Sequence, residues 1–175
     1  MATPPDLTQL AEQGKRDFEG GRYAAAADVF RSAAQGYADL GDQLNLAEQK
    51  NNLSVTLLKL RRPQESLAAV EGTDEVFAAA GDTRRQGMAW NNRAAALQDL
   101  NLLDDALAAY ERAAQLLGEA GEGELRGIAL KAAAALQLRR GRITESGLKM
   151  LGAMGSGMKP TWLERLLRWI LRRSP

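Results

Sequence analysis

Residues 81–121 read GDTRRQGMAWNNRAAALQDLNLLDDALAAYERAAQLLGEAG, and this pattern predicts a pair of helices. Gly81 and Asp82 suit a junction between helices, because glycine adopts the left-handed conformation and an Asp side chain accepts a free backbone N–H. A first helix is expected over about 83–100 and a second over about 103–119, since apolar residues recur at helical spacing in both. The segment is therefore a helix-turn-helix unit.

The unit recurs every 40 residues without an insertion, which identifies an internal repeat. Asn51-Asn52 returns as Asn91-Asn92. Four further sets keep the same spacing: Gly41, Gly81 and Gly121; Gly21, Arg61, Asn101 and Gly141; Ala26, Ser66, Ala106 and Ser146; Phe30, Val70, Tyr110 and Met150. We predict four units, at about 6–41, 42–81, 82–121 and 122–155.

Local signals place the turns in each unit. In the first unit, Asp6 begins a capping box and Gly20-Gly21 forms the internal turn. Asn101 stands at the break of the third unit, where a left-handed residue is tolerated. The second unit is expected to follow the same plan, with Pro63 in the first turn of its second helix.

The order of large and small residues resembles the tetratricopeptide repeat (TPR). In the third unit the residues that carry the resemblance are Trp90, Ala94, Asn101, Ala106, Tyr110 and Ala113. The second and fourth units depart from this pattern. Because the period is 40 residues, longer than the usual repeat, the chain resembles a branch of the family with longer helices. The resemblance implies a right-handed superhelix, an α-solenoid, whose first helices line a concave face.

A TPR-like superhelix implies a binding surface on that concave face. The candidates for contact with a peptide or partner protein are Lys15, Asn51, Asn52, Asn91, Asn92, Lys131 and Arg139. An Asn side chain offers both donors and an acceptor, so it can hydrogen-bond a ligand backbone of any sequence. The alternative is that these amides bond neighbouring helices and hold the units in register.

Composition argues against catalysis. The 175 residues include no His and no Cys, which excludes imidazole bases, thiol nucleophiles and the usual ligands of zinc and haem. We therefore predict no enzyme activity, no cofactor and no metal site. Because β-branched residues are few beside Ala and Leu, the composition also favours an all-α fold.

The end of the chain differs from the repeats. We assign residues 1–155 to the repeat domain and 156–175 to a glycine joint followed by a basic amphipathic helix. That helix, expected within 160–173, carries Arg side chains opposite an apolar face of Trp162, Leu163, Leu166, Leu167, Trp169 and Ile170. Three roles stay open for it: a cap on the last repeat, contact with an anionic membrane surface, and docking on another chain such as a second copy.

These features predict a scaffold or adaptor that binds a protein or peptide. The alternative is an assembly factor tethered to a membrane surface by the C-terminal helix. We expect no nucleic-acid binding, because the formal net charge of +1 combines a net charge of +4 in residues 159–175 with a net charge of −3 in residues 1–158. No signal peptide and no membrane-spanning helix are expected, which favours a cytoplasmic location, with peripheral membrane contact as the variant.

Overall fold

The structure, a computed structural model, describes residues 6–139. The chain divides into two compact units, Met1–Leu136 and Gln137–Pro175, and the account below concerns the first. All regular elements in the described residues are helices, which confirms the all-α prediction. They are α1 (Leu7–Glu19), α2 (Tyr23–Asp39), α3 (Gln43–Lys59), α4 (Pro63–Val70), α5 (Thr73–Ala79), α6 (Thr83–Asp99), α7 (Leu103–Glu119) and α8 (Gly123–Arg139).

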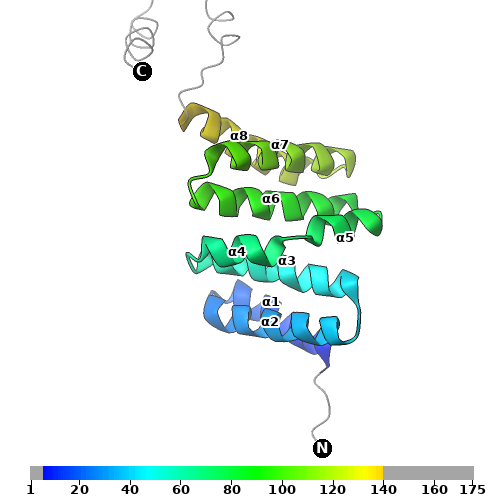
Figure 1. Cartoon of the computed structure of the whole chain (residues 1–175). Coiled ribbons are helices and arrows are strands. Elements are labelled where there is room, and N and C mark those ends of the chain that lie inside the picture. The colour runs from blue at the N-terminus through cyan, green and yellow to red at the C-terminus, as the bar shows by residue number, and fades with distance from the viewer. Residues whose placement is uncertain (1–5, 140–175) are drawn as a thin grey trace, which may run out of the picture. The chain divides into compact units, whose positions relative to one another are not determined.

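The helices repeat at the spacing found in the sequence. Helices α3, α6 and α8 begin at residues 43, 83 and 123, and each has 17 residues. Helices α2, α4 and α7 begin at residues 23, 63 and 103. Figure 1 shows the helices stacked one after another along the chain. For the third unit, α6 and α7 match the predicted helices to within one residue.

The turns contain the left-handed residues that the sequence indicates. Gly21, Arg61 and Asn101 have φ angles of 73°, 59° and 62°, so the same conformation recurs at intervals of 40 residues. Gly41, Gly81 and Gly121 form the second such set, with φ near 71–76°. Each turn thereby reverses the chain and sets a helix beside the preceding one.

Small residues let the first two helices approach closely. Gly14 of α1 faces Phe30 of α2, whose side chain is buried. A Cβ atom at position 14 would lie 2.6 Å from Phe30 Cε1, well inside van der Waals contact. The third unit uses alanine in the same way, because Ala94 and Ala106 are completely buried where α6 meets α7. Glycine and alanine therefore set the spacing within the helix pairs.

The second unit replaces two of these small residues with serine. Ser54 of α3 and Ser66 of α4 are completely buried, and their hydroxyl oxygens lie 2.8 Å apart. Each hydroxyl is the hydrogen-bond partner of the other, so no desolvated polar group is left unpaired. The serines thus fill positions that hold glycine or alanine in the first and third units.

The expectation of an uninterrupted second helix in this unit is wrong. The helix that begins at Pro63 ends at Val70, and α5 starts at Thr73. Gly72 between them has a φ of 75°, which breaks the helical ladder. The Thr73 hydroxyl donates to the Val70 carbonyl (2.8 Å) and Lys50 Nζ donates to the Glu71 carbonyl (2.9 Å), so side chains replace the missing backbone donors.

Several predictions fall on residues outside those described. They include the second helix of the fourth unit, the boundary at residue 155 and the amphipathic helix within 160–173, and these stay predictions. In residues 6–139, none of the helices is long and apolar enough to cross a membrane.

Candidate partner-binding face

The predicted contact residues lie on α1, α3, α6 and α8, the first helices of the four units. Helices α3 and α6 pack against each other, and between them they carry the four asparagines. Asn51 is buried, with 6% of its surface exposed, whereas Asn52, Asn91 and Asn92 are half-buried. All four asparagines therefore lie on two adjoining helices, which meet at the seam between α3 and α6.

One pair of asparagines is bonded across this seam. Asn92 Nδ2 donates to Asn51 Oδ1 at 2.8 Å and, more distantly, to the Asn51 carbonyl at 3.4 Å. These two residues join α6 to α3, as the structural alternative anticipates. Because the bond links helices of adjacent units, it fixes their relative register.

The other pair lacks such bonds. Asn52 Nδ2 and Asn91 Oδ1 are shielded from water and have no hydrogen-bond partner among the residues described. An unsatisfied buried amide atom costs on the order of 1–3 kcal/mol. The two free atoms are complementary in kind, one a donor and the other an acceptor.

The repeat explains why these two atoms are free. The bonded pair is separated by 41 residues. The positions 41 residues before Asn52 and 41 residues after Asn91 are Ala11 and Ala132. Since a methyl group cannot bond an amide, the Asn51–Asn92 bond has no equivalent at these positions. Neither amide is held in place by an inter-helix bond.

Lys15 is not a free cation on this face. Its Nζ lies 3.0 Å from Glu12 Oε1 and 3.7 Å from Glu48 Oε1. Glu48 also pairs with Arg85 Nη1 at 2.9 Å, which continues the ion-pair chain from α1 through α3 to α6. The hydrogen bond to Glu12, followed by the attraction of the Glu12 and Glu48 carboxylates, outweighs partial burial and raises the pKa of Lys15 above its ordinary value. The prediction that Lys15 contacts a ligand has no support in this pairing.

The last helix contributes exposed residues. Lys131 is exposed on α8, as are Ala135 and Leu138. Arg139 is the final residue of α8, and its side chain lies outside the described part of the structure. Lys131 therefore offers an exposed positive charge on α8.

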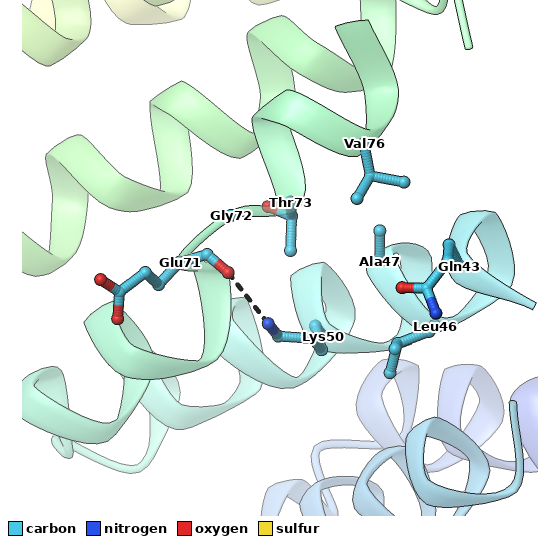
Figure 2. A pocket seen from close by; sticks show the side chains of 8 residues that line it. All are labelled: Gln43, Leu46, Ala47, Lys50, Glu71, Gly72, Thr73 and Val76. Carbon is cyan, nitrogen blue, oxygen red and sulfur yellow. Dashed lines mark hydrogen bonds between the residues drawn. The ribbon is translucent and has the colours of Figure 1, made fainter. Parts of the chain in front are cut away.

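Sequence reasoning missed a pocket at the break between α4 and α5. The pocket has a volume of about 190 Å³, and Figure 2 shows its lining of Gln43, Leu46, Ala47, Lys50, Glu71, Gly72, Thr73 and Val76. The available signal was the departure of Lys50 and Thr73 from the repeat pattern, because other units carry apolar residues there. That signal does not reveal a pocket without the position of the break.

The chemistry of the seam suits hydrogen bonding to a backbone. An extended peptide presents both carbonyl acceptors and N–H donors, which complement an amide donor and an amide acceptor. Among residues 6–139, no cluster of three or more acidic side chains is placed to hold a metal ion.

Comparison with known proteins shows a likeness in fold. No family model and no curated protein matches the chain. The crystal structure of BtubC (BKLC) from P. vanneervenii is similar, with a TM-score of 0.63 and 21% sequence identity over 91% of this chain and 69% of that chain. At this level of identity the likeness shows a shared helical fold alone.

Proposed function

We propose that the chain is a TPR-like superhelix of four units that acts as a scaffold or adaptor, binding an extended segment of a partner protein across the seam between α3 and α6. The 40-residue spacing of the helix starts and the likeness in fold to BtubC support the repeated helical architecture. The free amide atoms of Asn52 and Asn91 support the binding role.

These free atoms carry the proposal. Each amide sits on a half-buried residue and is unbonded to a neighbouring helix, so rotation of the side chain can bring Nδ2 of Asn52 or Oδ1 of Asn91 toward a ligand. A bound backbone would supply one acceptor and one donor, and the binding would remove an unsatisfied group that the free protein tolerates. Asn51 and Asn92 hold the two helices at a fixed register while this occurs.

The test begins with selection of peptides from a random twelve-residue library displayed on phage. Selected peptides are then synthesised and titrated calorimetrically into the purified chain. Since one neutral hydrogen bond contributes about 1 kcal/mol, Asn52→Ala and Asn91→Ala are each expected to weaken binding about three- to tenfold. The matched control is Gln64→Ala, which removes an exposed amide from α4.

Two outcomes contradict the proposal. One is a selection that enriches no peptide above background. The other is a set of peptides whose affinity is unchanged by Asn52→Ala and Asn91→Ala, or is lowered equally by Gln64→Ala.

A further inference from the structure

The second unit departs from the repeat at several positions that meet at one place. Lys50 stands where units one and three carry Leu10 and Trp90. Gly72 interrupts the helix, and Thr73 replaces an alanine of the other units. All three line the same pocket, as Figure 2 shows. Departures that converge in space indicate a local specialisation of this unit.

Lys50 is the unusual group in this pocket. Three basic side chains are half-buried within residues 6–138: Lys15, Lys50 and Arg85. Lys15 and Arg85 each pair with carboxylates. In that part of the chain, Lys50 has no carboxylate within ion-pair distance; its Nζ donates to the Glu71 carbonyl at 2.9 Å. Figure 2 shows the Glu71 carboxylate pointing away from the ammonium group.

Among the described residues, Lys50 therefore has no ion-pair partner. An ammonium group has three N–H donors, and the Glu71 carbonyl accepts from one of them. Partial removal of a charge from water is unfavourable without a counter-charge. Charge-assisted hydrogen bonds to a carboxylate are stronger than neutral ones, so a carboxylate is the group that best complements this site.

The remaining walls suit a short carbon chain. Leu46, Ala47 and Val76 give the pocket an apolar side. A Cβ atom built at Gly72 would meet nothing within 4 Å, so the side nearest the break is open. The volume of about 190 Å³ accommodates one side chain of ordinary size but no large ligand.

We propose that the pocket formed by Lys50 and the break between α4 and α5 binds a carboxylate group. The carboxylate comes from an acidic side chain or from a chain terminus, and Lys50 Nζ binds it while the Glu71 carbonyl keeps the ammonium group in place. The assignment of this carboxylate to the partner peptide rests on the proposed function above. The affinity of the pocket for a carboxylate is independent of that proposed function.

The experiment follows the backbone amide signals of Gly72 and Thr73 in nitrogen-15-labelled full-length protein. Three probes are titrated: N-acetylglutamate α-amide for a side-chain carboxylate, N-acetylglycine for a chain terminus, and N-acetylglutamine α-amide as the neutral control. Saturable shifts with one or both acids, and none with the neutral amide, are expected. The acid that binds more tightly identifies the source of the carboxylate.

Variants connect the signal to Lys50. Lys50→Gln keeps an N–H donor for the Glu71 carbonyl but removes the charge, and it is expected to weaken binding about tenfold or more. Lys59→Gln on the same helix is the matched control, because Lys59 is exposed and outside the pocket. Val76→Met narrows the pocket without altering Lys50 and is also expected to weaken binding, which keeps the test decisive if Lys50→Gln disturbs the fold.

Shifts that never saturate, or that are as large for the neutral amide as for the acids, overturn the proposal. Equal binding by the wild type, Lys50→Gln and Val76→Met does so as well. Acid binding here, together with peptide binding unaffected by Asn52→Ala and Asn91→Ala, would support the pocket and refute the seam. If no acid binds in the pocket but Asn52→Ala and Asn91→Ala weaken peptide binding, the pocket alone is refuted.

Discussion

At the scale of single residues, the distance between α1 and α2 depends on a glycine, which has no side chain to hold the two helices apart. Gly14 allows α1 to lie against the Phe30 ring, which is completely enclosed. Sequence analysis could anticipate this role, because a small residue recurs at the same place in every unit. The contact with Phe30 in particular needed the structure.

Replacing Gly14 with alanine tests this packing. The added methyl group would lie 2.6 Å from Phe30 Cε1, so we expect a loss of about 1–3 kcal/mol in unfolding free energy despite the better helix propensity of alanine. Gly127→Ala in α8 is the control, since its methyl group would meet nothing within 4 Å and is expected to be neutral or stabilising by up to about 1 kcal/mol. Urea titration followed by circular dichroism measures both. Equal unfolding free energies for Gly14→Ala and Gly127→Ala would show that the close approach of α1 to Phe30 is unimportant for stability.

The buried Ser54–Ser66 pair gives a second prediction at this scale. Ser54→Ala leaves the Ser66 hydroxyl buried without a partner and is expected to cost about 1–3 kcal/mol. The double variant Ser54→Ala/Ser66→Ala removes both hydroxyls and is expected to be more stable than the sum of the single effects implies. A double-mutant cycle by chemical denaturation measures the coupling. Strict additivity would mean that the two hydroxyls do not stabilise each other.

Both serines were visible in the sequence as departures from the repeat. Their mutual bond was not, because the pairing of residues 54 and 66 depends on how two helices are rotated toward each other. The same limit applies to Asn51 and Asn92, whose bond spans 41 residues. Sequence patterns singled out the four asparagines but could not separate bonded from unbonded amides.

At the scale of elements, the turns were predictable and the helix break was not. Left-handed residues at 21 and 101 fit the preferences of glycine and asparagine, so the period placed both turns correctly. The break at Gly72 follows from no such rule, because a single glycine costs a helix only about 1 kcal/mol and is often tolerated. Lys50 and Thr73 stabilise the break by bonding the carbonyls that it exposes.

The turn at Arg61 offers a stabilising substitution. Arg61 has a φ of 59°, a conformation that costs an L-residue with a Cβ atom about 1–2 kcal/mol. Arg61→Gly is expected to raise the unfolding free energy by about 0.5–1 kcal/mol, since Gly21 holds the equivalent position in the first unit and the greater freedom of unfolded glycine offsets part of the gain. Thermal and urea unfolding of the variant measure the change. A loss of stability would indicate that the arginine side chain stabilises the turn.

At the scale of the whole molecule, the 40-residue period predicted the helix boundaries because each unit repeats the same caps and turns. What the period could not predict was where the repeat fails. Alanine stands 41 residues from Asn52 and from Asn91, where the repeat of the Asn51–Asn92 bond would need an amide, and the proposed binding face rests on the unbonded amide atoms of these two asparagines. The functional proposal therefore comes from departures from the pattern more than from the pattern itself.

The side-chain amide signal of Asn52 tests the central claim most directly. In nitrogen-15-labelled protein, titration with a selected peptide is expected to shift the Asn52 Nδ2 protons downfield and slow their exchange with water, because the group gains an acceptor. The Asn92 Nδ2 protons, already bonded to Asn51, are expected to change little. A peptide that binds tightly while the Asn52 amide signal stays unchanged would contradict the account.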